Sequence, residues 1–409
     1  MRKNSSTIIM VMFIVSVVTV ACGLPDLTQN QPTNEPPLST DTQEVLFDAA
    51  SPTEAAFETP LPTFGATDVE EEPALSTPNS GQISYLYDGN LWVYSVDTGG
   101  VIQITAFGAG NGLVTNYPRA QFSPDGRYLA FNIGSGSWIK DFDTNETIDI
   151  SPYGIFFVWT GTGTEYFAIR GDMECPAIEN LEDQGLLNFD IIRIDVQNPS
   201  SSSLITNVAG GLRFVGAISL NGEWGSINSC GCYSECGPGS LWHLPTSNKV
   251  SPPAGVEAGN FDFSYDSQQM VFWRQQMYGY VDAPLYRANT DYSELTVLFA
   301  SANAAPVKAL WSPDDTWIAF SSVSFDAELS ETDRCLWLVK PDGTQVTGVE
   351  CGFAELLSWS PDGTQLLYSK NYGGIEQLFI YDILSTSKTL IPIHMDPYTQ
   401  GYIDWGRIP

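Results

Sequence analysis

From residue 81 to the C-terminus, short runs of alternating apolar and polar residues follow one another, with turn-forming residues between them. In segments such as 127–133, 316–322 and 365–370 the alternation has the period of a strand with one buried face. A large apolar residue recurs at a matched place in the run that follows, at Trp92, Trp138, Ile192, Trp242, Tyr286, Trp337 and Phe379. The pattern predicts an all-β fold of short strands.

One turn motif separates the first two runs of each unit. It reads FSPDG at 122–126, WSPDD at 311–315 and WSPDG at 359–363. Serine suits the first position of a tight turn, proline presets φ at the second, and glycine relieves backbone strain at the fourth. Weaker copies stand at 159–161, 218–222 and 263–266, and a truncated copy at 404–406. The motif therefore indicates a repeated hairpin.

Four short strands in about 45 residues are typical of one propeller blade. The last copy of the first strand, Tyr402–Trp405, has no further strands after it, and the first unit, Gln82–Ala106, has no first strand before it. Joined, they complete one blade and close the ring, which removes exposed sheet edges. The sequence thus predicts a seven-bladed β-propeller of four-stranded antiparallel blades over 81–409.

The units, which approximate W-S-P-D-G-x-x-[IL]-x-[FY], resemble the WD40-like repeats of TolB-type propellers. They are also similar to the N-terminal propeller of dipeptidyl peptidase IV-type enzymes. The resemblance implies the fold and leaves the function open. TolB carries an α/β domain before a six-bladed propeller, so a Tol–Pal role is not implied here. The chain also lacks the G-x-S-x-G elbow of a hydrolase half.

The N-terminus has the features of an export signal. Arg2 and Lys3 precede the apolar stretch 8–20, whose length of about 13 residues is short of the ~20 that a spanning helix needs. Small residues then lead to Cys22, as in a bacterial lipobox. We expect a lipoprotein signal peptide over 1–21 and lipidation of Cys22, with anchoring on the outer side of the cytoplasmic membrane. Ordinary secretion and an uncleaved anchor are the alternatives.

Residues 22–80 are predicted to be a disordered, acidic, Pro/Thr-rich tether. After Cys22 the segment holds nine prolines and eleven acidic residues, and it has no lysine or arginine. Such a composition buries too little apolar area to offset the chain entropy lost on folding.

Charge narrows the function classes. The chain has 48 acidic and 17 basic residues, a formal net charge of −31, which argues against binding to nucleic acid or, through a basic patch, to anionic lipid. Membrane contact is therefore expected through the lipid anchor only. The two histidines, His243 and His394, leave little scope for histidine chemistry.

The long insertions fall between the second and third strands of four successive blades, at 171–189, 229–239, 275–283 and 323–334. In a propeller these loops lie on one face, and loops on a rigid scaffold commonly carry binding. The acidic and aromatic candidates for this binding face are Tyr233, Tyr278, Tyr280, Asp282, Phe325 and Asp326. We expect a monomeric, non-catalytic scaffold that recognises a protein or polysaccharide partner.

Six cysteines remain beside Cys22, and export favours disulfides. Cys335 and Cys351 should pair, because one hairpin returns the chain to the same face. Cys175 should pair with one of the cysteines in the next blade, and the remaining two with each other; these three are Cys230, Cys232 and Cys236. A four-thiolate zinc site is the alternative for these four residues. No cofactor is expected, with Ca²⁺ or zinc as the ions to consider.

The competing functional class is a carbohydrate-active propeller enzyme, a glycosidase or a lyase. Such enzymes use paired carboxylates. Asp262, Glu355 and Asp404 fall on or near first strands, which line the propeller axis.

Overall fold

The computed structural model describes residues 81–106, 119–133, 136–171, 188–209, 213–229, 239–274, 284–301, 303–325, 331–372, 375–396 and 400–407. The chain divides into two units, Met1–Glu72 and Pro73–Pro409, and every described residue belongs to the second. Cys22, the predicted signal peptide and the predicted tether lie outside the described residues, so those expectations stay predictions.

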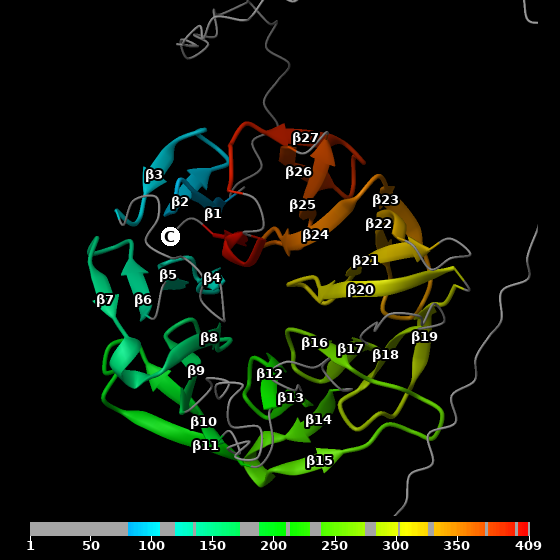
Figure 1. Cartoon of the computed structure of the whole chain (residues 1–409), viewed down its shortest axis with the longest axis horizontal. Coiled ribbons are helices and arrows are strands. Elements are labelled where there is room, and N and C mark those ends of the chain that lie inside the picture. The colour runs from blue at the N-terminus through cyan, green and yellow to red at the C-terminus, as the bar shows by residue number, and fades with distance from the viewer. Residues whose placement is uncertain are drawn as a thin grey trace, which may run out of the picture. The chain divides into compact units, whose positions relative to one another are not determined.

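The second unit is a ring of seven four-stranded antiparallel sheets, as predicted (Figure 1). Blade 1 consists of β28 (Asp404–Gly406), β1 (Gln82–Tyr87), β2 (Asn90–Ser95) and β3 (Val101–Gln103). Blades 2 to 4 consist of β4 (Arg119–Phe122), β5 (Tyr128–Ile133), β6 (Gly136–Asp141) and β7 (Thr147–Asp149); β8 (Ile155–Trp159), β9 (Glu165–Gly171), β10 (Asn188–Asp195) and β11 (Ser202–Ala209); and β12 (Arg213–Ile218), β13 (Trp224–Ser229), β14 (Ser240–His243) and β15 (Asn248–Val250).

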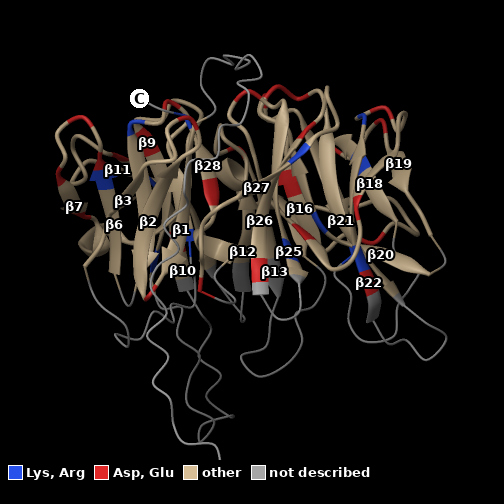
Figure 2. Ribbon diagram, turned by 90° about the horizontal axis from the view of Figure 1, so that it is seen from above, with Lys and Arg blue, Asp and Glu red and all other residues tan. Residues whose placement is uncertain are grey.

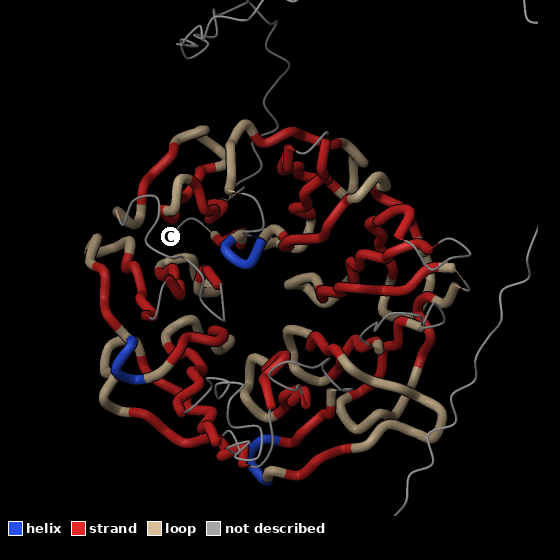
Figure 3. Tube along the Cα trace, viewed as in Figure 1, coloured by secondary structure: helices blue, strands red, loops and turns tan. Residues whose placement is uncertain are grey.

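Blades 5 to 7 consist of β16 (Asn260–Phe263), β17 (Gln269–Trp273), β18 (Leu285–Asn289) and β19 (Thr296–Phe299); β20 (Ala304–Trp311), β21 (Ile318–Phe325), β22 (Glu331–Val339) and β23 (Thr347–Glu350); and β24 (Ala354–Trp359), β25 (Gln365–Tyr372), β26 (Ile375–Asp382) and β27 (Lys388–Ile391). The helical segments with described bounds are the 3₁₀ turns η1 (Ser151–Tyr153), η3 (Leu244–Thr246) and η4 (Gln400–Tyr402) (Figure 3).

The ring is closed by the end of the chain. The C-terminal strand β28 pairs antiparallel with β1, with Trp405 opposite Ile83 and Asp404 opposite Ser84. The Ser84 hydroxyl donates to the carbonyl of Tyr402 (2.9 Å) and accepts from the Asp404 amide (3.1 Å). The predicted closure is confirmed. The strand starts at Asp404 and not at Tyr402, which belongs to η4, so the predicted start was two residues early.

A buried serine holds five of the motif turns, and Thr160 takes its place in blade 3. In blade 6, Ser312 Oγ donates to Asp314 (2.6 Å) and accepts from the amide of Trp317 (2.9 Å). The fourth residue of the turn has positive φ at Gly126, Gly222 and Gly363. Asp315 takes the same left-handed backbone conformation although it has a side chain. The motif therefore encodes a tight turn, as its composition predicts.

The hydrophobic core is divided into seven clusters of buried residues, one at each seam between neighbouring blades. Motif aromatics lie in these seams. The indole N–H of Trp159 donates to the carbonyl of Gln121 (2.9 Å), and that of Trp359 to the carbonyl of Leu310 (3.2 Å), so each crosses to the preceding blade. Apolar burial and these hydrogen bonds together fix the blades to one another.

The blade 6 insertion is shorter than predicted. Segment 323–334 is not all loop, because β21 continues to Phe325 and β22 begins at Glu331, with Val323 opposite Arg334. Cys335 consequently lies inside β22 and does not open it. Ladder pairing satisfies the backbone groups of these residues, which outweighs the weak strand preference of the acidic ones.

Candidate functional site

An axial cavity of about 650 Å³ lies between the first strands of the blades. Side chains alternate across a strand, so the residue before each seam-facing motif aromatic faces the axis. Six cavity-wall residues stand directly before a motif aromatic: Gln121, Val158, Asp262, Leu310, Ser358 and Asp404. The turn prolines Pro124, Pro313 and Pro361 line the cavity at the motif end of the strands, and η4 lines it near their other end.

Two of the three predicted axial carboxylates line this cavity. Asp262 and Asp404 belong to the first strands β16 and β28 and line the cavity; Figure 2 shows these strands from the side, with acidic stretches in red. Glu355 is not in the cavity lining and lies 3.8 Å from Arg334, with which it forms an ion pair. The cavity wall therefore holds two of the three carboxylates, Asp262 from blade 5 and Asp404 from blade 1.

Both cavity carboxylates tie neighbouring blades together. Asp404 Oδ2 accepts from the amide of Phe122 in blade 2 (2.9 Å), and its Oδ1 accepts from the Ser358 hydroxyl in blade 7 (2.9 Å). Asp262 Oδ2 accepts from the amide of Trp311 in blade 6 (2.8 Å). These bonds give the acids a structural role in the inner wall.

Burial changes the acidity of both groups. Desolvation raises the pKa of Asp262 to about 7, although the amide bonds and the charge of Lys308 oppose the rise. Desolvation also raises the pKa of Asp404 against the hydrogen bonds from Phe122 and Ser358. At neutral pH Asp262 is thus close to its titration midpoint.

Two partly buried cations, Arg119 and Lys308, share the cavity wall with the acids, and Arg407 lines the wall at the motif end. Arg119 donates to the carbonyl of Phe157, and its guanidinium carbon lies 4.7 Å from the centre of the Phe157 ring. Lys308 Nζ donates to the carbonyl of Leu357 (3.2 Å). Desolvation lowers the pKa of both groups, and nearby carboxylates raise it in part.

Sequence reasoning missed these two cations, although a signal for them exists. Each stands three residues before a motif aromatic, Phe122 for Arg119 and Trp311 for Lys308. Counting back from that aromatic would have placed both in strands that line the axis.

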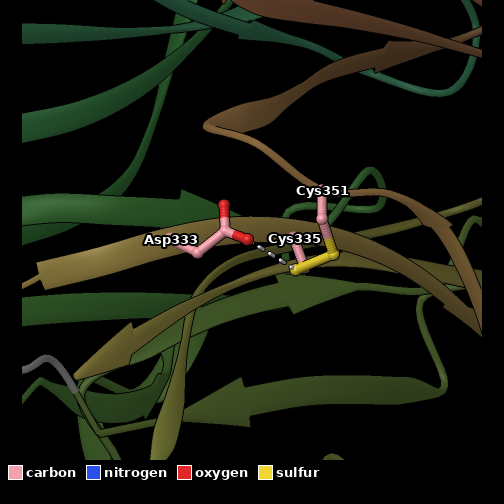
Figure 4. Close-up of side chains that lie close together, drawn as sticks. All are labelled: Asp333, Cys335 and Cys351. Atoms are coloured by element: carbon pink, nitrogen blue, oxygen red, sulfur yellow. Dashed lines mark hydrogen bonds between the residues drawn. A yellow bond between two sulfur atoms is a disulfide. The ribbon is translucent and has the colours of Figure 1, made fainter. Parts of the chain in front are cut away.

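The opposite end of the first strands belongs to the loop-bearing face, which we define as the face of the strand 2–3 and blade-to-blade connections. Here Cys335 and Cys351 form the predicted disulfide, with Cα atoms 4.1 Å apart (Figure 4). Asp333 Oδ1 accepts from the amides of Gly352 (2.8 Å) and Phe353 (3.1 Å), which fixes the connection from blade 6 to blade 7.

Asp333, Cys335 and Cys351 place three ligand-type atoms within 4.8 Å of one another. A disulfide sulfur carries no proton or negative charge to bind a cation, so the 3.9 Å approach of Cys335 to Asp333 is a contact only. The cluster stiffens the face and offers no thiolate ligand.

Ion pairs of Glu350 also link blade 6 to blade 7. Glu350 lies 2.9 Å from Lys370 and 2.7 Å from Lys388, both in blade 7. Burial alone would raise the pKa of Glu350, but its hydrogen bonds to the two lysines lower it. The disulfide and Asp333 therefore hold the connection from blade 6 to blade 7, and the ion pairs of Glu350 join the two blades.

The other predicted site residues are placed only in part. Tyr233, Tyr278, Tyr280, Asp282 and Asp326 lie outside the described residues, and for Phe325 only the backbone, at the end of β21, is described. The same holds for the cysteines of blades 3 and 4, Cys175, Cys230, Cys232 and Cys236. His243 packs against Trp224, with ring centres 4.9 Å apart, and its Nδ1 is 2.8 Å from Thr246 Oγ1, which fits a structural role.

Among the described residues, no helix has both the length and the apolar character to cross a lipid bilayer. The ring, its axial cavity and its stiffened face define the chain as a seven-bladed β-propeller protein.

No known family and no curated protein matches the sequence. The fold is similar to that of an oligogalacturonate lyase from Vibrio parahaemolyticus (14% identity, 75% of this chain and 92% of the lyase, TM-score 0.55). It is also similar to a prolyl endopeptidase (14% identity, 76% of this chain, TM-score 0.52), of which it spans about half, 49%. A TolB structure from Acinetobacter baumannii aligns with a TM-score of 0.41 at 13% identity, over 80% of this chain and 82% of TolB.

At these identities the likeness concerns the fold alone. The propeller fold that the repeats imply is thus confirmed, and the likeness to a peptidase propeller is one of fold, which leaves binding and catalysis both open.

Proposed function

We propose that this protein is an exported, lipid-anchored, non-catalytic scaffold that binds a partner protein or polysaccharide through its loop-bearing face. The observation that carries the proposal is the reinforcement of that face by the Cys335–Cys351 disulfide and the Asp333 hydrogen bonds. Recognition surfaces gain affinity when the scaffold is already rigid, because less entropy is lost on binding. A disulfide also accords with an oxidising compartment outside the cytoplasm.

The state of the axial carboxylates supports binding over catalysis. A general acid or base must release or accept a proton at the substrate. Both oxygens of Asp404 already accept hydrogen bonds from neighbouring blades, and Asp262 accepts one from Trp311. Their use as ties between blades accounts for their presence without a reaction.

The alternative, a carbohydrate-active enzyme, has one specific observation in its favour. The pKa of Asp262 is raised to about 7 in a cavity that also holds Asp404. A carboxyl with a pKa near the working pH is suited to general acid–base catalysis. Oligogalacturonate is the natural first substrate to assay, since a lyase for it shares the fold.

Affinity capture from an envelope extract, combined with a glycan array, tests the proposal. Replacing segment 275–283 with a short Gly/Ser turn should abolish capture of the partner. Leu384→Lys is the control, because Leu384 is 95% exposed on a turn of the other face. Capture that survives the loop replacement would contradict the proposal, as would turnover of oligogalacturonate that Asp262→Asn abolishes.

A further inference from the structure

Arg119 and Lys308 line the axial cavity from blades 2 and 6, and each donates one hydrogen bond to a described residue. A guanidinium has five N–H donors and an ammonium three. The protein partner of each within the described part of the chain is one main-chain carbonyl, that of Phe157 for Arg119 and that of Leu357 for Lys308. Neither cation forms a salt bridge with a described residue, whereas eight other basic residues do.

The two cations are close enough to affect each other. Burial lowers the pKa of Lys308, the charges of Glu355, Asp262 and Asp404 raise it, and the charge of Arg119 lowers it further. Two desolvated like charges facing one cavity cost free energy, which a bound anion would recover.

The neighbouring acids offset the charge of this pair in part, but within the described residues none of them forms a salt bridge with Arg119 or Lys308. Asp404 directs both oxygens at Phe122 and Ser358, and Asp262 directs one at Trp311. Glu355 is outside the cavity lining and pairs with Arg334. The remaining cation of the wall, Arg407, donates to the carbonyl of Pro361 at the motif end.

We infer that the axial cavity is a binding site for a small carboxylate-bearing molecule, whose anionic group contacts Arg119 and Lys308. The volume of about 650 Å³ lies within the usual range for small-molecule sites, about 300–1,000 Å³. A guanidinium and an ammonium in the same desolvated wall are suited to strong charge-assisted hydrogen bonds with a carboxylate. The hydroxyl of Ser358 and the amide of Gln121 add polar groups to the same wall. This site does not depend on the partner proposed for the loop-bearing face.

Calorimetric titration of the full chain with glucuronate, glucose and N-acetylglycine tests the inference. Glucuronate should bind and glucose, its uncharged counterpart, should not. Arg119→Gln and Lys308→Met should each weaken binding roughly 10-fold or more, which corresponds to one lost charge-assisted hydrogen bond. Lys308→Arg should retain binding, and so should Lys340→Met, because Lys340 packs on Trp317 and is not in the cavity lining.

A second readout needs no variant. In the wild-type protein, bound glucuronate should protect Lys308 from acetylation by acetic anhydride, measured by mass spectrometry, while glucose should not. Binding of N-acetylglycine as well would support recognition of the carboxylate alone, and binding of glucuronate only would support a sugar acid. Binding of neither acid, equal binding of glucose, or Lys308 acetylation unchanged by both acids would overturn the inference.

Discussion

At the scale of single residues, the inner wall of the ring is polar and charged where an ordinary core would be apolar. Asp262 and Asp404 join neighbouring blades through main-chain amides, and Ser358 adds a side-chain bond to Asp404. Buried polar groups are tolerated when their hydrogen bonds are made. The charged groups therefore hold the first strands together. Because their burial shifts their pKa values, the free energy of unfolding should depend on pH.

Asp262 should make the protein less stable as the pH rises from about 4 to about 7. Its pKa is raised to about 7 in the folded protein, against about 4 in the unfolded chain, so in this window the native state binds more protons. In Asp262→Asn, whose amide oxygen can still accept from Trp311, this loss is absent. The free energy of unfolding of the variant relative to wild type should therefore increase by about 1–3 kcal/mol between pH 4 and pH 7. This range is smaller than the full pKa shift of Asp262 implies, because the cavity is large enough to hold water.

Urea unfolding at four or five pH values measures this difference. Asp342→Asn is a suitable control, since that exposed carboxyl bonds to Thr344 within its own turn and its pKa is lowered. A relative stability of Asp262→Asn that stays flat across the window would show that Asp262 titrates normally.

At the scale of elements, hairpins follow one another around the ring and the last strand joins the first blade. Deleting Gly401–Pro409 removes β28, and with it the inner strand of blade 1 and the buried Trp405. We expect the melting temperature to fall by roughly 10 °C or more, because two seams lose apolar contacts and β1 becomes an unpaired edge. Deletion of residues 408–409 alone is the control. Equal melting temperatures for the two truncations would refute closure by β28.

The disulfide is the second element-scale device. Cys335 and Cys351 are separated by 16 residues, and opening such a loop in the unfolded chain should cost about 3 kcal/mol of stability. The double variant Cys335→Ser/Cys351→Ser should therefore unfold at lower urea than wild type. Reduction with dithiothreitol should lower the urea midpoint of wild type. In the variant this disulfide is absent, so reduction should cause no loss of stability from it. Equal midpoints for variant and oxidised wild type would contradict a stabilising role.

The repeated units were predictable from sequence because the turn motif is local chemistry. Serine, proline and a fourth residue with positive φ suffice to define each turn, and alternation then gives the strands on both sides. The extension of β21 and β22 through Val323 and Arg334 was missed, because pairing across a hairpin depends on the partner strand. Arg119 and Lys308 were missed as site residues for a related reason: their meeting in one cavity depends on ring closure, which brings together blades far apart in sequence.

At the scale of the whole molecule, the location that we propose is outside the cytoplasm, with the ring held at the membrane by a lipid. The predicted anchor is Cys22, so Cys22→Ser should move the protein from the membrane fraction to the soluble fraction. Fractionation followed by immunoblotting measures this, with Cys335→Ser as a cysteine control remote in sequence from the lipobox. A Cys22→Ser protein that still sediments with membranes would show that the chain is anchored in another way.

The most direct test of the binding account is to block one face of the ring at a time. Azidophenylalanine can replace Phe353, 47% exposed on the loop-bearing face, or Leu384, 95% exposed on the other, and each can then carry a polyethylene glycol chain. We expect the polymer at position 353 to lower partner capture roughly 10-fold or more, since a bulky group blocks an interface, and the polymer at position 384 to have little effect. Capture unaffected at position 353 and lost at position 384 would contradict recognition through the loop-bearing face.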